Sequence, residues 1–409
     1  MKKKLFLLLV VVLAVASLPL ATAYGRQGTV VPQVVTMPEQ IAGGRDVHIT
    51  VSDKPASDQT VELAVWEAQV AKFQEMYPNV SIEGVEVKYD PTAYIAMIAG
   101  DQLPTLFLTY FTEPEKFIGQ DVVADLTPYY EATGLSDIYN ANVLSIASQD
   151  GKIYGIPNFA YSLGLAYNID MLSAAGFDAP PATWDELAEM AVALTDKDNG
   201  VAGFGFINDG SGATGWHYTN IAYGFGATPN DIIKPNGDGT YTATFGEGAT
   251  VDALQYINNL RWEYDVLPGA TLDWASITEA LVSERVAMVI YAGDQFSFMK
   301  NQYPDADLNK FGYAPVPAGP DGATALTGGS LRMIDSSASA DEQEAAFYFQ
   351  VWRQFDPAEI EASIVADSEQ GRAVGQPVLP LYVGDYQAKI EEFRAQYNVL
   401  PVENYTLFN

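Results

Sequence analysis

Residues 47–80 decide the fold class, and they read VHITVSDKPASDQTVELAVWEAQVAKFQEMYPNV. In the first five residues apolar side chains alternate with polar ones, which is the period-two pattern of a β-strand. From Leu63 to Tyr77 large apolar residues recur at spacings of three and four, which places them on one face of a helix. Pro78 ends that helix, and Val80 begins a second apolar strand. The stretch therefore predicts a strand, a helix and a second strand in succession.

The same alternation of strands and helices continues on both sides of Gly151–Gly155. Further strands are predicted at 80–87, 106–110, 203–207 and 286–291, and further helices at 91–99, 184–194, 251–264, 340–355 and 386–397. Thr183 and Glu186 have the spacing of a capping box at the start of one helix. Strands that alternate with helices of this length predict two α/β lobes.

The composition excludes several classes of partner and chemistry. The 409 residues include 21 Lys and Arg against 52 Asp and Glu, a formal net charge of −31. Nucleic-acid binding needs a basic surface, so we expect no such partner. The chain has no Cys and only two His, which excludes disulfides, thiolate chemistry and zinc sites built from Cys and His. We expect no metal and no cofactor, and the 48% hydrophobic content predicts a globular chain of more than one domain.

The N-terminus has the three parts of a secretory signal. Lys2–Lys4 is cationic, Leu5–Ala16 is apolar, and Ala21–Ala23 has small residues at the cleavage positions. We expect cleavage after this triplet and export to the periplasm or the outer face of the cytoplasmic membrane, without a Cys-linked lipid. The alternative is that residues 1–23 remain as an uncleaved anchor. Residues 24–46 show no period and are rich in Gly, Pro, Thr, Val and Gln, which predicts a flexible stalk.

Common catalytic motifs are missing from the sequence. It contains no G-x-S-x-G, no G-x-x-x-x-G-K-[ST] and no G-x-G-x-x-G that follows a strand and opens a helix. His48 falls in a predicted strand and is expected at the surface. His217 lies in Gly215–Tyr218, a predicted loop without a nucleophile motif. Glycoside hydrolysis needs only two carboxylates, so it stays open as an alternative, although no motif marks such a pair.

Short motifs follow one another in a fixed order between about Val47 and Phe355. They are Phe73–Val80, Ala99–Pro104, Asp150–Pro157, Ala166–Asn168, Ala175–Phe177, Pro181–Leu187, Val286–Ile290 and Pro315–Pro320. Together they resemble the extracellular solute-binding proteins of family 1, the maltose-binding-protein-like group that serves ABC importers.

This resemblance implies a two-lobed periplasmic-binding-protein-like type II fold, with discontinuous lobes joined by hinge crossings. The implied boundaries are lobe 1 at 47–158 plus 313–334 and lobe 2 at 159–312 plus 335–409, with crossings near 156–163, 311–316 and 332–337. The lobes would close on a ligand and present it to a membrane permease.

Sugar sites combine aromatic surfaces with hydrogen-bonding side chains, so the tryptophans are the first candidates for ligand contact. The four that fall in or beside helical patterns are predicted to pack in the core: Trp66, Trp184, Trp262 and Trp352. Trp216 and Trp274 lie in segments with few other large apolar residues. They are candidates for ligand contact, together with His217 and Tyr218.

The resemblance adds candidates in lobe 1 and at the first crossing. Asp53 and Lys54 stand where related maltose-binding proteins carry an Asp-Lys pair that holds hydroxyls, the alternative being a solvated loop. Tyr110 ends a predicted strand and is a candidate aromatic wall. Phe159 and Tyr161 are two residues apart in a strand, so they are expected to face the same side.

Two departures from the family pattern bear on the ligand. Asp294 and Gln295 stand where the family commonly has Pro-Trp, and Gln295 cannot stack on a sugar ring. This argues against maltodextrin and for a smaller or differently oriented carbohydrate. Gly328–Gly329 resembles the glycine pair before the third crossing, where the backbone or Ser330 would approach the ligand. Arg332 is expected either to bind the ligand or to pair with an acid.

These features predict a monomeric carbohydrate-binding protein of an ABC importer, with no enzymatic activity. One alternative is a binding protein for another small solute, such as a polyol phosphate or a polyamine. A phosphate would require converging Arg and Lys side chains or a helix N-terminus, and a polyamine would require carboxylates that face aromatic rings. A secreted glycosidase with a carboxylate pair is the alternative from a different class.

Overall fold

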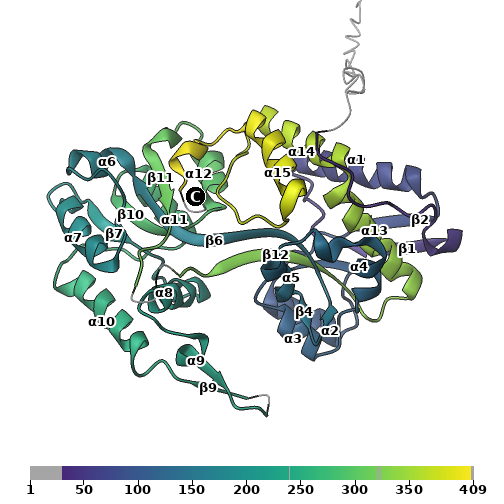
Figure 1. Cartoon of the computed structure of the whole chain (residues 1–409), viewed down its shortest axis with the longest axis horizontal. Coiled ribbons are helices and arrows are strands. Elements are labelled where there is room, and N and C mark those ends of the chain that lie inside the picture. The colour runs from purple at the N-terminus through teal and green to yellow at the C-terminus, as the bar shows by residue number, and fades with distance from the viewer. Residues whose placement is uncertain (1–29, 239, 320–321, 323, 407–409) are drawn as a thin grey trace, which may run out of the picture.

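The computed structural model describes residues 30–238, 240–319, 322 and 324–406. The predicted signal segment lies outside these residues. Figure 1 shows two lobes joined by a pair of long strands, β6 (Ile156–Asn168) and β12 (Thr327–Ile334), that cross the middle of the molecule. Each lobe combines strands with covering helices, which confirms the predicted two-lobed α/β fold. No helix in the described part of the chain is long and apolar enough to cross a membrane.

One eight-stranded sheet runs through both lobes. Besides β6 and β12 it contains β1 (Val47–Val51), β2 (Val80–Gly84), β3 (Leu106–Tyr110), β7 (Ala202–Gly205), β10 (Val286–Ala292) and β11 (Phe311–Ala314). The strand order is β2-β1-β3-β12-β6-β10-β7, with β11 also paired to β6. The first half of β6 pairs with β12 and the second half with β10 and β11. The strand β6 therefore belongs to the sheet of both lobes, and its side chains lie within reach of both.

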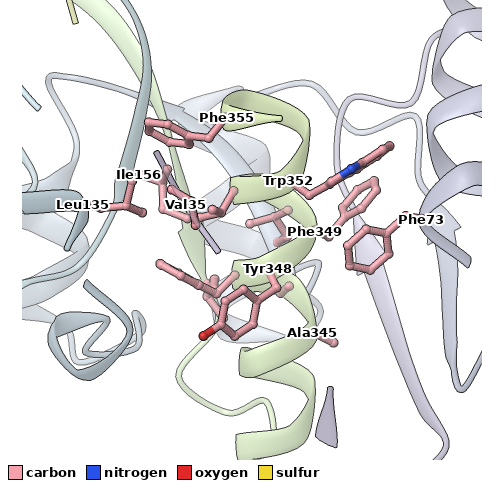
Figure 2. Packing of buried hydrophobic residues seen from close by; sticks show 14 of the residues in the cluster. Val35, Phe73, Leu135, Ile156, Ala345, Tyr348, Phe349, Trp352 and Phe355 are labelled. Carbon is pink, nitrogen blue, oxygen red and sulfur yellow. The ribbon is translucent and has the colours of Figure 1, made fainter. Parts of the chain in front are cut away.

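Lobe 1 is held together by aromatic packing between helices that are far apart in the sequence. Its helices are α1 (Thr60–Met76), α2 (Pro91–Ala99), α3 (Pro114–Gly119), α4 (Thr127–Thr133), α5 (Ala141–Ile146), α13 (Ala340–Phe355), α14 (Pro357–Glu369) and α15 (Gly384–Arg394). Phe73 of α1 lies 5.1 Å from Phe349 and 5.6 Å from Trp352 of α13, measured between ring centroids. Figure 2 shows these rings facing one another beside α13. Their burial fixes α13 against lobe 1.

The predicted flexible stalk is wrong for residues 30–46. Val31 and Val35 are buried in the lobe 1 core. The backbone N–H of Val31 donates a hydrogen bond to the Glu361 carboxylate on α14 (2.8 Å). The segment lacks a local period because the side chains that order it come from α13 and α14, at the other end of the sequence.

The predicted lobe boundaries also need correction at the C-terminal end. Residues 335–409 were expected in lobe 2, but α13, α14 and α15 contribute to the lobe 1 core. The antiparallel pairing of β12 with β3 keeps the chain in lobe 1, so no crossing occurs at 332–337. Leu400 and Tyr405 pack in a lobe 2 cluster, which places the last crossing near them. β11 belongs to lobe 2, and the second crossing therefore falls between β11 and β12.

Lobe 2 differs from the prediction at two tryptophan-bearing segments. Its helices are α6 (Ile169–Ala174), α7 (Trp184–Leu194), α8 (Gly212–Gly224), α9 (Pro229–Ile232), α10 (Ala249–Trp262), α11 (Trp274–Val282) and α12 (Gln295–Gln302), with a hairpin of β8 (Ile233–Pro235) and β9 (Tyr241–Ala243). The predicted loop at Gly215–Tyr218 lies inside α8, whose Ser211 cap accepts a hydrogen bond from the Ala213 N–H (3.2 Å). Trp262 was expected in the core but is 76% exposed at the end of α10.

Candidate functional site

Five side chains that the sequence singled out form one aromatic cluster, made of Phe159, Tyr161, Trp216, His217 and Trp274. The rings of Phe159 and Tyr161 on β6 lie 5.8 Å apart, as expected for neighbours on one face of a strand. Trp216 of α8 meets Tyr161 at 6.0 Å and Trp274 at 6.2 Å. His217 lies 5.3 Å from Trp274. Three segments separated by more than 50 residues each thus place two half-buried indoles beside the strand that joins the lobes.

The two tryptophans are fixed in different ways. Trp274 is the first residue of α11, directly after Asp273, whose side chain caps the helix by accepting from the Ser276 N–H (2.8 Å). It packs against both core clusters of lobe 2. Trp216 packs against one of these clusters only. Trp274 is therefore more deeply tied to the lobe core, and Trp216 is the better candidate for a ligand surface.

His217 and Tyr218, two candidates for ligand contact, each make a hydrogen bond within lobe 2. The buried Nε2 of His217 has no partner among the described residues. The His217 side chain is fully buried, and its Nδ1 accepts a hydrogen bond from the Ile207 N–H (3.2 Å). Burial lowers the pKa of His217 to about 3, so the ring is neutral at physiological pH. The Tyr218 hydroxyl donates to the Thr250 carbonyl (2.9 Å) and ties α8 to α10.

Asp294 and Gln295 each have an unsatisfied side-chain acceptor, and Asp294 lies close to Tyr161 of the aromatic cluster. Asp294 Oδ1 and Gln295 Oε1 are buried and have no hydrogen-bond partner among the described residues. Burial raises the pKa of the Asp294 carboxyl to about 6. The Asp294 charge in turn adds to the effect of burial in raising the pKa of the Tyr161 hydroxyl, as does Tyr110 from lobe 1. Groups from both lobes therefore converge on Tyr161.

On the lobe 1 side, Asp53 and Arg332 bind each other. Arg332 Nη1 lies 3.2 Å from Asp53 Oδ2 and 3.3 Å from the Ser52 carbonyl oxygen, and its side chain is buried. Burial lowers the pKa of Arg332 and raises that of Asp53, while each partner opposes the shift of the other. Of the two alternatives for Arg332, pairing with an acid is the one observed. The Asp53 side chain keeps 23% exposure, so part of it stays open to a ligand.

The other lobe 1 candidates, Tyr110, Ser330 and Lys54, differ in how much of each side chain is exposed. Tyr110 is 48% exposed at the end of β3, and its ring lies 5.1 Å from that of Tyr89. Ser330 is buried and hydrogen-bonds Asn158 Oδ1 (3.2 Å), which leaves little of it for a ligand. Lys54 is half-buried. Tyr110 is thus the lobe 1 aromatic best placed to face the cluster.

The glycine pair before Ser330 makes room for aromatic rings of the chain itself. A Cβ atom on Gly328 would lie 2.4 Å from Tyr161 Cζ, and one on Gly329 would lie 2.6 Å from Phe111 Cε2. The space that the glycines leave is thus filled by the chain itself. A Cβ on Gly329 would lie closest to the backbone oxygen of Phe159 on β6 (2.3 Å), and one on Gly328 would meet the Tyr161 ring.

Gly328→Ala should therefore push the Tyr161 ring out of place. We expect the free energy of unfolding to fall by about 1–3 kcal/mol, as for other overpacked sites, and ligand affinity to fall with it. Thermal melting and calorimetric titration measure the two effects. Gly119→Ala, where a Cβ meets no atom within 4 Å, is the matched control and should change neither. Wild-type affinity in Gly328→Ala would show that the position of Tyr161 does not matter for binding.

Sequence reasoning missed a large cavity beside the hinge. This hinge cavity has a volume of about 830 Å³ and is bounded by residues 158–160 of β6, the facing parts of α13 and α14, and residues 373–382. In Figure 1 the C-terminal segment and α15 lie on one side of the β6–β12 pair, and α8 lies on the other. Of the predicted site residues only Phe159 lines the cavity, so the aromatic cluster and the hinge cavity meet at Phe159 and otherwise have different linings. No sequence motif marks the cavity, because its walls come from distant segments.

The structure offers no group of three or more His, Asp and Glu side chains that could hold a metal ion within the residues it describes.

Comparisons with known proteins agree on one family. The family model of bacterial extracellular solute-binding proteins matches residues 56–350. An ABC transporter-binding protein of Deinococcus radiodurans is 27% identical over 48% of this chain and 46% of its own length. The chain spans about half the length of the curated relatives it matches.

Solved structures agree on the fold. A solute-binding protein of Thermotoga lettingae bound with α-D-tagatose has a TM-score of 0.64 at 20% identity, over 89% of this chain and 88% of its own. Maltose-bound MalE3 of T. maritima has a TM-score of 0.60 at 20% identity, over 86% and 98%. With a family model that covers most of the folded part, the chain belongs to the bacterial extracellular solute-binding proteins.

Proposed function

We propose that this protein captures a carbohydrate at the aromatic cluster and delivers it to the permease of an ABC importer. The main support is a buried acceptor without a partner among the described residues, Asp294 Oδ1, on a carboxylate that lies close enough to Tyr161 to raise the pKa of its hydroxyl. The Tyr161 ring in turn contacts Trp216. A buried acceptor without a donor is costly, and sugar hydroxyls supply donors. The half-buried indole of Trp216 supplies an apolar surface for the CH face of a sugar ring.

The proposal includes two further points. The protein acts outside the cytoplasm as a monomer, and it releases its ligand chemically unchanged. The relatives named for tagatose and maltose support a sugar as ligand by analogy, and the missing tryptophan at Gln295 favours a mono- or short oligosaccharide over a long maltodextrin.

A polyamine is the second candidate, because Asp294 lies beside aromatic rings. A polyamine carries several positive charges and would need several free carboxylates. Asp53 is neutralised by Arg332, and burial raises the pKa of Asp294 to about 6. One partly protonated carboxylate fits a sugar hydroxyl better than a polycation.

A thermal-shift screen over monosaccharides, short oligosaccharides, polyols and spermidine tests the proposal. A true ligand at about 100 times its Kd should add about 2.7 kcal/mol of stability. Incubation of the same sugars as aryl glycosides with the protein should release no aryl alcohol. A shift with spermidine alone, or turnover of a glycoside, would replace the proposed function by the corresponding alternative.

Ligand binding should also reduce the radius of gyration. The lobes touch away from the hinge where the Tyr241 hydroxyl, on the β8–β9 hairpin, donates to Glu115 Oε1 on α3 (3.3 Å). This contact is exposed and contributes little by itself, so we expect the ligand-free lobes to separate in solution and the ligand to bring them together. Small-angle scattering with and without the sugar found in the screen measures the change. An unchanged radius of gyration at saturation would count against hinge closure.

A further inference from the structure

The hinge cavity contains a cation that the chain itself does not neutralise. Arg353, near the end of α13, lines this cavity. Its Nε donates to Gln69 Oε1 (3.0 Å), and its guanidinium lies 5.4 Å from the ring centroid of Phe349. No carboxylate in the described part of the chain lies within ion-pair distance of Arg353, and its two Nη atoms donate no hydrogen bond there.

The acidic side chains of the same cavity already have partners. Glu359 is paired with Lys72, Asp367 with Arg372 (3.4 Å), and Glu391 with Arg394 (2.7 Å). Glu359 lies near enough to Arg353 to favour its charged form, yet its ion pair is with Lys72. Arg353 is therefore the one charged residue lining the hinge cavity that lacks an ion pair among the described residues.

The charges behind the cavity wall do not neutralise Arg353 either. Burial, followed by repulsion from Arg332, lowers the pKa of Arg353 to about 9, with Asp53 and Glu359 acting in the opposite sense. The Asp53 carboxylate is within ion-pair distance of Arg332. The two carboxylates that act on Arg353, Asp53 and Glu359, are thus already paired with other cations, Arg332 and Lys72. This local positive charge stands out in a chain with a net charge of −31.

We propose that the hinge cavity is a second binding site, which takes a small hydroxylated organic anion whose carboxylate or phosphate group binds Arg353. A guanidinium matches both groups with two parallel N–H···O bonds. The cavity of about 830 Å³ is large enough for a molecule of sugar size. Asn398, which lines the cavity, has a buried Oδ1 without a partner among the described residues and can accept from a ligand hydroxyl.

This site would sense how the lobes are arranged. Val402 and Tyr405 line the cavity from the chain end that packs in lobe 2. Gln376, another lining residue, hydrogen-bonds Ser297 of α12 in lobe 2. An anion held by Arg353 on lobe 1 would therefore contact parts of both lobes.

Calorimetric titration with D-glucuronate, D-glucose 6-phosphate and neutral D-glucose tests this site at constant ionic strength. We expect saturable binding of at least one of the two anions by the wild type. Arg353→Gln should weaken anion binding at least tenfold. Arg353→Lys keeps the positive charge but loses the two parallel N–H donors of the guanidinium, so it should weaken anion binding less. Arg394→Gln is the matched control, because Arg394 lines the same cavity but is paired with Glu391. The comparison of carboxylate with phosphate shows which group the site prefers.

The outcomes separate this site from the aromatic cluster. Trp216→Ala should leave anion affinity unchanged, whereas Arg353→Gln should leave the affinity for a neutral sugar unchanged. A wild type that binds neither anion, or an Arg353→Gln variant that binds them as well as the wild type does, would overturn the proposal. Because Arg353 also contacts Gln69 and Phe349, thermal melting of each variant must show a folded protein. A wild type that binds neither anion contradicts the proposal without any variant.

Discussion

Trp216→Ala should weaken sugar binding by about 10- to 70-fold. A sugar ring stacked on the indole buries on the order of 60–100 Å² of apolar surface, which at about 25 cal/mol per Å² contributes roughly 1.5–2.5 kcal/mol. One decade of affinity corresponds to about 1.4 kcal/mol. Trp216 is half-buried against Tyr161, so its outer part remains for a ligand. Calorimetric titration with the sugar found in the screen measures the loss.

Trp274→Ala is the control for this variant. Trp274 packs against both lobe 2 clusters at the start of α11, so its removal should lower the melting temperature of the empty protein more than that of Trp216. Its effect on affinity should be the smaller of the two. The reverse order, with wild-type affinity in Trp216→Ala, would move the ligand surface to Trp274.

Asp294→Asn should stabilise the ligand-free protein above pH 6 while it weakens sugar binding. The pKa of Asp294 rises from 3.8 to about 6 on folding because the carboxylate is buried. At about 1.4 kcal/mol per pKa unit, the ionised carboxylate costs up to about 3 kcal/mol of stability at neutral pH, which the neutral amide avoids. The amide also loses the charge-assisted acceptor for a sugar hydroxyl, which should lower affinity about tenfold or more.

The pH dependence follows from the direction of the shift. Between about pH 4 and pH 6 the folded protein holds a proton on Asp294 that the unfolded chain has released, so this carboxyl lowers stability as pH rises through that window. The stability difference between Asp294→Asn and the wild type should be near zero below pH 4, grow to pH 6 and stay constant above it. Chemical denaturation at several pH values measures the difference. A pH-independent difference for Asp294→Asn would mean that Asp294 is not a buried ionisable group.

Local sequence patterns predict the bounds of several elements that are amphipathic or flanked by residues typical of helix and strand ends. The helices at 91–99 and 340–355 and the strand at 106–110 occur with the predicted bounds. The pairing of Phe159 with Tyr161 on one face of β6 also follows from the period of a strand. These features depend on neighbours in the sequence, which a single chain displays directly.

Other features depend on contacts between distant segments. The sequence of α8 does not predict a helix, because Gly212, Gly215 and polar residues interrupt its apolar period. Residues 30–46 looked flexible because their partners lie on α13 and α14. The same holds for the hinge cavity, where Arg353 and Gln376 come together only in the folded chain. The Asp53–Arg332 ion pair likewise joins residues that are 279 positions apart in the sequence.

The most direct test of sugar binding at the aromatic cluster is calorimetric titration of the wild type, Trp216→Ala and Arg353→Gln with the neutral sugar that gives the largest thermal shift. We expect one sugar per chain in the wild type, an affinity about 10- to 70-fold lower in Trp216→Ala, and wild-type affinity in Arg353→Gln. Unchanged affinity in Trp216→Ala together with loss of binding in Arg353→Gln would place the sugar in the hinge cavity and contradict the assignment of the aromatic cluster.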